Sequence, residues 1–194
     1  MMERLLELDR ELFLFLNGLH SPFMDPIMYF LTDGRAWLPL YLFTGYLVYK
    51  QYKKESLWIV AGIILSIVIT DQITTTFMKP FFARLRPSHE PSLVGLVHHV
   101  NNYLGGLYGF ASSHAANTFG VTMFLWLILR QHYRWAVLLF IWPAVMSYSR
   151  IYLGVHYPGD ILVGTLIGLL TGWLVFRLYL RLRRRQDTSK VSDA

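Results

Sequence analysis

Five long apolar runs constrain the fold of this 194-residue chain more than any other feature. They cover approximately residues 36–49, 57–78, 115–129, 135–148 and 161–180. A helix needs about 20 mainly apolar residues to cross the hydrocarbon core of a bilayer, so the shorter runs are expected to extend into their flanks. Charged residues make up only 15% of the chain, whereas typical soluble domains contain about 25%. The sequence therefore predicts an integral membrane protein, with a soluble all-helical domain as the alternative.

The predicted fold class is all-α: an integral membrane helical bundle of about five or six transmembrane helices with an N-terminal interfacial amphipathic helix. We expect a single membrane domain over residues 1–194, with interfacial helices in 1–33, an external loop in 79–113 and a basic cytoplasmic tail in 181–194. Breaks such as Pro22 favour one or two helices that lie in the outer interface. The alternative is a sixth span, which would place the N-terminus on the inner side.

The basic residues gather on one side of the membrane if the five runs alternate in direction. Eleven of the eighteen Lys and Arg residues fall there, in two short connections and near the C-terminus. They are Lys50, Lys53, Lys54, Arg130, Arg134, Arg177, Arg181, Arg183, Arg184, Arg185 and Lys190. The positive-inside rule makes this side cytoplasmic. We attribute the net charge of +6 to contact with the membrane surface, and no nucleic-acid partner is expected.

Polar side chains that are able to carry chemistry collect at the opposite, external ends of the helices. They occur in the segments KPFFARLRP (79–87), ASSHAAN (111–117) and SRIYLGVHYPGD (149–160). Lys79, Arg84, Arg86 and Arg150 bring positive charge to a side where the positive-inside rule disfavours it. Snorkelling to lipid headgroups is the simpler interpretation of any one of them. Together they indicate an anionic ligand, because the planar fork of Arg suits phosphate oxygens.

The segment Ser112-Ser113-His114 leads directly into the third apolar run. Serine is a preferred N-cap residue, so a purely structural cap is one interpretation. A capped helix start also offers free N–H groups and the positive end of the helix dipole, which together bind anions. His114 would add an acid or a base at the same point, and the two interpretations coexist.

The segment HYPGD begins the last apolar run. Pro158 suits the first helical position, which places His156 just before the helix and Asp160 in its first turn. A carboxylate near an imidazole holds one tautomer and raises its basicity. An acidic residue that complements the helix dipole is the alternative for Asp160. The chain has no cysteine, and its histidines lack partnering carboxylate clusters, so neither a metal site nor a cofactor is predicted.

Taken in order, these segments resemble the three signatures of the type 2 phosphatidic acid phosphatase family. KPFFARLRP fits Lys-x6-Arg-Pro, ASSH fits Pro-Ser-Gly-His loosely, and SRIYLGVHYPGD fits Ser-Arg-x5-His-x3-Asp. The family includes bacterial undecaprenyl diphosphate, phosphatidylglycerophosphate and lipid A phosphatases. The motifs run from Lys79 to Asp160, and hydropathy extends the resemblance over most of the chain.

The resemblance implies a metal-independent phosphatase with three catalytic residues. His156 would be the nucleophile that attacks phosphorus and becomes a phosphohistidine. Asp160 would orient it and support its charge. His114 would protonate the leaving oxygen and then activate the water that hydrolyses the intermediate.

The resemblance also implies a set of residues that bind the phosphoryl group. Lys79, Arg86 and Arg150 would hold its oxygens and stabilise the charge that develops on them. Ser112 and the backbone of Ser113 would complete the cradle.

Two motif positions differ from the family pattern, and two charged residues lie outside it. Ala111 replaces the motif proline, and Ser113 replaces a glycine that favours positive φ. We expect Ser113 to be accommodated and to add a hydroxyl to the phosphate. Arg84 is expected to reach a second phosphate, a lipid headgroup or water. Asp71, inside a span, is expected to make a polar contact that supports the site.

The predicted function is a lipid phosphatase at the outer face of the cytoplasmic membrane, with undecaprenyl diphosphate as the favoured substrate. Lipid A phosphate and phosphatidylglycerophosphate are the alternatives. A non-enzymatic lipid or anion transporter is the alternative of another class, and a haloperoxidase is disfavoured by the membrane spans. The predicted partners are the lipid phosphate substrate and membrane lipids, and the sequence does not determine an oligomeric state.

Overall fold

The structure, a computed structural model, describes the backbone of residues 2–192 and the side chains of residues 3–184. This part of the chain is helical and contains no strand, which confirms the all-α class. The α-helices are α1 (Met2–Gly18), α2 (Met24–Leu31), α3 (Leu38–Tyr52), α4 (Ser56–Asp71), α5 (Lys79–Phe82), α6 (Ser113–Leu129), α7 (Ile141–Tyr152) and α8 (Pro158–Ser192). The short 3-10 and π segments are η1 (Gly34–Trp37), η2 (Lys53–Glu55), η3 (Gln72–Met78), η4 (Pro87–His89), η5 (Pro91–Leu93) and η6 (Arg134–Phe140).

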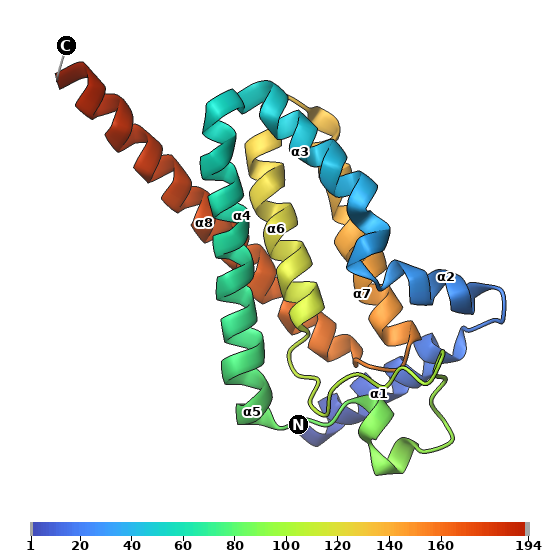
Figure 1. Ribbon diagram of the computed structural model, residues 1–194. Helices are drawn as coiled ribbons and strands as arrows, with labels where there is room; N and C mark the ends of the chain where they lie inside the picture. Colours follow the sequence, from blue (N-terminus) through green and yellow to red (C-terminus); the bar gives the residue numbers. More distant parts are fainter. Residues whose placement is uncertain (1, 193–194) are drawn as a thin grey trace.

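Each of the five apolar runs forms one long helical segment. They correspond to α3, α4 with η3 and α5, α6, η6 with α7, and α8. Among the described residues, the helical stretches Gly34–Phe82 and Pro158–Arg184 are long and apolar enough to cross a membrane, and Ser113–Leu129 is a shorter apolar helix. The first stretch turns back on itself at η2, so α3 and α4 run in opposite directions (Figure 1).

The two ends of the bundle differ in character, as the alternation of the apolar runs predicts. The turns between α3 and α4 and between α6 and η6, which carry the basic residues, lie at one end with the C-terminal part of α8 (Figure 1). The other end holds α1, α5, the start of α8 and the loop of residues 83–112. The chemistry-bearing segments are thereby separated from the basic end by the length of the bundle.

The segments expected from the sequence differ in part from the elements of the structure. Residues 1–33 contain two helices, α1 and α2, and their placement in a membrane interface stays a prediction. The basic tail continues α8 as a helix to Ser192, and residues 193–194 of that tail lie outside the described residues. Lys79 belongs to helix α5 rather than to the external loop, which is therefore shorter than expected at this end.

Helices α6 and α8 are in backbone contact along a row of glycines. A Cβ atom on Gly164 would stand 2.5 Å from the carbonyl oxygen of Ser112, and one on Gly168 or Gly172 would collide with the backbone of Ala116 or Gly120. Only small residues allow helix axes to approach this closely. The spacing of four residues places Gly164, Gly168 and Gly172 on one face of α8, and this face meets α6.

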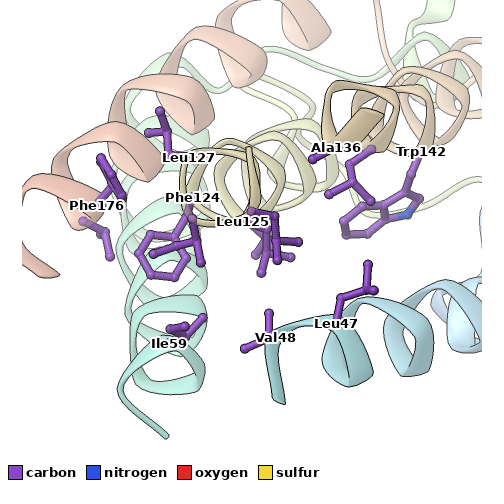
Figure 2. Packing of buried hydrophobic residues seen from close by; sticks show 14 residues of the cluster. Leu47, Val48, Ile59, Phe124, Leu125, Leu127, Ala136, Trp142 and Phe176 are labelled. Atoms are coloured by element: carbon purple, nitrogen blue, oxygen red, sulfur yellow. The ribbon is translucent and has the colours of Figure 1, made fainter. Parts of the chain in front are cut away.

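The main apolar core surrounds α6 in the half of the bundle nearer to the basic end. Phe124 of α6 is completely buried and faces Gly62 of α4, whose missing side chain leaves room for the ring. Side chains from α3, α7 and α8, including Val48, Trp142 and Phe176, close the cluster (Figure 2). In a bilayer these side chains exchange contacts with lipid tails for contacts with one another, so close packing holds the five helices in fixed relative positions.

The loop of residues 83–112 is joined at its two ends by backbone hydrogen bonds. The N–H of Arg86 donates to the carbonyl of Leu107 at 3.1 Å, and that of Gly109 donates to the carbonyl of Arg84 at 2.9 Å. Leu85 and Tyr108 form an isolated antiparallel bridge between these bonds. The pairing brings both arginines of the first motif close to the start of α6.

The α6–α8 contact generates a stability prediction. Gly168→Leu should drive a side chain into the backbone of α6, and overpacking of this kind costs about 1–3 kcal/mol or more. We expect a clearly lower midpoint of thermal unfolding in detergent micelles, followed by intrinsic fluorescence. Leu166→Ala, on an exposed position of the same helix, is the control and should unfold close to the wild-type temperature. An unchanged midpoint for Gly168→Leu would contradict the close contact.

Candidate active site

The three motif segments meet at the end of the bundle opposite to the basic turns. Lys79 comes from α5, Arg86 from the loop after it, and Ser112, Ser113 and His114 from the start of α6. Arg150 lies in the last turn of α7, His156 in the α7–α8 connection and Asp160 in the first turn of α8. All eight predicted site residues therefore lie at the same end of the fold, although the chain separates them by up to about eighty residues.

His156 is almost completely buried, with 1% of its surface exposed. Its Nδ1 lies 3.3 Å from Oδ2 of Asp160, and its Nε2 lies 3.2 Å from Nη1 of Arg86. Because a guanidinium only donates hydrogen bonds, Nε2 must accept here, and the ring proton sits on Nδ1 facing the carboxylate. The arrangement selects the tautomer whose free lone pair is on Nε2.

The surroundings of His156 also favour its neutral form. Burial lowers the pKa of the imidazole well below its ordinary value, and the positive charges of Arg86, Arg150 and Lys79 lower the pKa further. Near neutral pH the ring is therefore uncharged and its Nε2 is able to act as a nucleophile.

Asp160 uses both of its oxygens on the protein. Oδ2 accepts from the backbone N–H of Tyr157 at 3.0 Å in addition to its contact with His156, and Oδ1 accepts from Nη1 of Arg84 at 2.9 Å. The bond to Tyr157 is the helix-start contact of a capping box, in which an acidic residue at the third helical position reaches back to the N-cap. Pro158 occupies the first helical position, as predicted. One side chain therefore makes both the helix-start contact and the contact with His156.

Arg84 does not extend toward a second phosphate, a headgroup or water, and this expectation is wrong. Its guanidinium bridges Asp160 and Asp9 of α1, with Nη2 at 2.7 Å from Oδ2 of Asp9. It also lies over the ring of Tyr157, 4.1 Å from the centroid. Two carboxylates hold this side chain more strongly than solvent would. Asp9 was missed because nothing in its own segment connects it with residues about 75 positions further along the chain.

Arg86 and Arg150 are buried cations held by uncharged partners. Arg86 donates from Nε to the carbonyl of Tyr108 at 3.1 Å, and burial together with the charge of Arg150 lowers its pKa to about 10, so it stays charged at neutral pH. Arg150, 1% exposed, donates to Oγ1 of Thr32 at 2.7 Å and to the hydroxyl of Tyr103 at 3.1 Å. Within the described residues, its Nε is buried without a hydrogen-bond partner.

The two serines at the start of α6 have different roles. Ser112 is the buried N-cap, and its hydroxyl accepts from the N–H of Ala115 at 3.4 Å. Ser113 lies in the first turn of the helix and is not among the residues with positive φ, so the exchange of the motif glycine causes no backbone strain. Its hydroxyl accepts from Nζ of Lys79 at 2.7 Å and contacts Thr74 at 2.9 Å. The hydroxyl therefore holds the lysine in place.

The polar contact predicted for Asp71 is present, and its support of the site stays a prediction. Thr75 donates its hydroxyl to Oδ1 of Asp71 at 3.0 Å, and the same Thr75 oxygen lies 3.0 Å from Oγ of Ser113. Asp71 therefore reaches Lys79 through a hydroxyl chain rather than through direct contact.

His114 differs from His156 in its environment. Its side chain is exposed in the first turn of α6, while the charges of Arg150, Arg86 and Lys79 and the ring of His156 all act on it electrostatically. One histidine is therefore enclosed and oriented by a carboxylate, and the other is open to incoming molecules. Among the described residues, no group of three or more His, Asp or Glu side chains is arranged to hold a metal ion.

An apolar cavity of about 580 Å³ begins one turn below His114. Asn117, Thr118 and Val121 of α6 line one wall, and residues of α3, α4 and α7 line the others. Its surface includes Gly45 of α3, where an added Cβ would meet no atom within 4 Å. A chain of apolar groups would be able to lie here while a polar group reached the start of α6.

Comparison with known proteins relates the whole bundle to one family. The model of the PAP2 superfamily matches residues 38–184. The chain is 42% identical over 188 residues to a lipid A 4'-phosphatase of Porphyromonas gingivalis, with 95% of this chain and 78% of the relative covered. It is 30% identical over 172 residues to an undecaprenyl-diphosphatase of Sulfolobus acidocaldarius, with 86% of this chain and 74% of the relative covered.

A solved structure supports the fold. The crystal structure of a transmembrane PAP2 type phosphatidylglycerolphosphate phosphatase from Bacillus subtilis matches with a TM-score of 0.66 at 21% identity, over 92% of this chain and 87% of that chain. The arrangement of helices is therefore shared at low sequence identity.

The environment of His156 generates a prediction about its protonation. An ordinary histidine has a pKa of about 6.5, and because burial lowers the pKa of His156, its ring should stay neutral at that pH and gain a proton only in more acidic solution. Nitrogen NMR of histidine-labelled protein should show a neutral ring with the proton on Nδ1 between pH 6 and 8. The resonance is assigned by its loss in His156→Ala. A titration midpoint at or above the ordinary value would contradict the described environment.

Proposed function

This chain belongs to the PAP2 superfamily and is a membrane lipid phosphatase, and we propose that it hydrolyses a phosphate of lipid A at the outer face of the cytoplasmic membrane. The observation that carries the chemistry is the buried imidazole of His156, whose Nδ1 faces Asp160 and whose Nε2 carries the free lone pair. A non-enzymatic transporter would need cations to bind a phosphate but would have no need of an oriented, neutral imidazole.

In the first half of the proposed reaction, Nε2 of His156 attacks phosphorus. The P–N bond forms as the bond from phosphorus to the lipid oxygen breaks, and His114, whose protonated form the negative charge of the bound phosphate favours, donates its proton to that oxygen. The imidazole becomes a cationic phosphohistidine, which Asp160 stabilises through the Nδ1–H contact. Arg86, whose Nη1 faces Nε2 in the free protein, exchanges this contact for an oxygen of the phosphoryl group.

In the second half, His114 acts as a base. It takes a proton from water as the water oxygen attacks phosphorus, the P–N bond breaks, and inorganic phosphate leaves. His156 is again neutral and His114 is again protonated, so the two steps balance. The exposed position of His114 supports this role, because both the lipid oxygen and the water must reach it.

Three cations and a helix start are proposed to bind the phosphoryl oxygens. Lys79, Arg86 and Arg150 act electrostatically on the same imidazole, and the Ser112 cap begins α6 beside them. The buried Nε of Arg150 lacks a partner among the described residues, and a phosphate oxygen would supply one. These groups are held by protein contacts before substrate binds, which is the condition for strong electrostatic stabilisation.

The favoured substrate is revised from undecaprenyl diphosphate to lipid A phosphate. The chain is 42% identical to a lipid A 4'-phosphatase but 30% identical to an undecaprenyl-diphosphatase. The apolar cavity below His114 supports a lipid whose acyl chain enters between α3, α4 and α6. Phosphatidylglycerophosphate remains the second candidate lipid.

The outer face is supported by the distribution of charge. The basic turns and the site lie at opposite ends of the bundle (Figure 1), and the positive-inside rule assigns the basic end to the cytoplasm. The site would then face the exterior of the cytoplasmic membrane.

The nucleophile is tested by His156→Ala. We expect phosphate release from lipid A in detergent micelles to fall by about 1,000-fold or more, because removal of a nucleophile leaves only the binding contribution. The wild type should release phosphate faster from lipid A than from undecaprenyl diphosphate or phosphatidylglycerophosphate, and should do so in EDTA. His132→Ala, at an exposed histidine of the basic end, is the control. Retained activity in a folded His156→Ala protein would overturn the mechanism.

The cavity is tested by Gly45→Phe. A Cβ at this position meets no atom within 4 Å and Gly45 lines the cavity, so the protein should fold while the ring takes the place of the acyl chain. We expect the KM for lipid A to rise by about tenfold, and hydrolysis of a short, water-soluble phosphomonoester to stay unchanged. Gly45→Ala should behave like the wild type with both substrates. Equal effects of Gly45→Phe on both substrates would contradict the proposed chain site.

A further inference from the structure

Asp9 of α1 contacts the start of the helix that carries Asp160. Its Oδ1 accepts from the backbone N–H of Gly159 at 2.7 Å, and its Oδ2 accepts from Nη2 of Arg84 at 2.7 Å. The first N–H groups of a helix have no partner within the helix. Asp9 therefore acts as an N-capping group for α8, although it lies about 150 residues earlier in the chain.

The contact with Gly159 depends on the absence of a side chain there. A Cβ atom at this position would stand 2.7 Å from Oδ2 of Asp9. The glycine of the HYPGD segment is therefore required by the carboxylate that approaches it, and not by positive φ.

Helix α1 is fixed against the rest of the fold by residues that follow Asp9. Arg10 donates to the carbonyl of Ser92 at 3.0 Å, and the amide of Asn17 donates to the carbonyls of Ile151 and Tyr152 at 3.1 and 2.8 Å. Phe13, completely buried, packs edge-on against Tyr157 with the ring centroids 5.3 Å apart. Asp9 is thus held in register with α8, although α1 lies outside the residues 38–184 that the family model matches.

The charges of this cluster are shared among three groups. The guanidinium of Arg84 bridges two carboxylates, at 2.9 Å from Asp160 and 2.7 Å from Asp9. If Asp160 were its only partner, the full positive charge of Arg84 would offset the carboxylate that faces His156. Because Asp9 takes part of this charge, more of the negative charge of Asp160 remains available to the Nδ1–H of His156.

We propose that Asp9 is a positioning residue for the phosphatase reaction, which acts through Arg84 and Gly159 to hold Asp160 in place and to preserve its negative charge opposite His156. The inference rests on the proposed function, since it assigns Asp160 the task of stabilising the phosphohistidine. Asp9 itself touches neither His156 nor any of the cations proposed to bind phosphate. Asp160 stabilises the positive charge that develops on His156 during the reaction. Asp9 should therefore affect kcat rather than substrate binding.

Asp9→Asn tests this role, since the amide oxygen is still able to accept a hydrogen bond while the negative charge is lost. We expect kcat on lipid A to fall by about 10- to 100-fold, which is the range for residues that orient a functional side chain without contacting the substrate. KM should change less than twofold. Asp9→Glu should recover part of kcat. Glu11→Gln, an exposed carboxylate of the same helix, should match the wild type. A KM effect equal to the kcat effect would overturn the proposal.

A double-mutant cycle and one spectroscopic measurement separate positioning from simple destabilisation. In an Arg84→Gln background, Asp9→Asn should cause little further loss of kcat, because both changes act through one guanidinium. Asp9→Asn should also shift the NMR resonance of the Nδ1–H of His156, and Glu11→Gln should not. Additive losses with an unmoved resonance would overturn the inference. A wild type that releases no phosphate from any lipid would overturn the proposed function, and the resonance would then decide the role of Asp9 by itself.

Discussion

Helices α6 and α8 approach so closely that backbone atoms of α6 occupy the space where side chains of α8 would otherwise stand. This contact fixes the register of the two helix starts that carry the site. The N–H of Ser112, the N-cap of α6, donates to the carbonyl of Asp160 in the first turn of α8 at 3.0 Å. His114 and the His156–Asp160 pair consequently keep a defined relation to each other. A bilayer gives no hydrophobic drive for helix association, so packing at small residues has to supply it.

The site gathers buried positive charge that the protein alone does not neutralise. Arg150 is held by the hydroxyl of Thr32 and by the hydroxyl and ring of Tyr103, none of which is negative. Burial of an unpaired ion costs several kcal/mol. A dianionic phosphoryl group would offset this cost when it binds. The core around Phe124, in the other half of the bundle, is what allows the fold to carry such a site (Figure 2).

Two carboxylates, Asp160 and Asp9, contact both the start of α8 and the guanidinium of Arg84. Asp160 caps its own helix and faces the imidazole, while Asp9 caps the same helix from another part of the chain and draws on the same arginine. The cluster therefore links the N-terminal helix to the surroundings of His156 through helix-start contacts and the guanidinium of Arg84. Nothing in it requires a residue of unusual conformation.

The sequence by itself determined the helical class, the five apolar segments, and the separation of the basic turns from the three motif segments, whose eight candidate residues the fold brings to one end of the bundle. These features are encoded locally, because hydropathy, helix caps such as Pro158 and motif spacing each extend over a few residues to one helix. Only the tertiary structure decided the partners of Arg84, the contacts of Asp9 with Arg84 and Gly159, the use of the Ser113 hydroxyl by Lys79 and the contacts of Arg150 with Thr32 and Tyr103. A long side chain reaches several possible partners, and which one it meets depends on how segments distant in sequence close against each other. No local pattern carries that information.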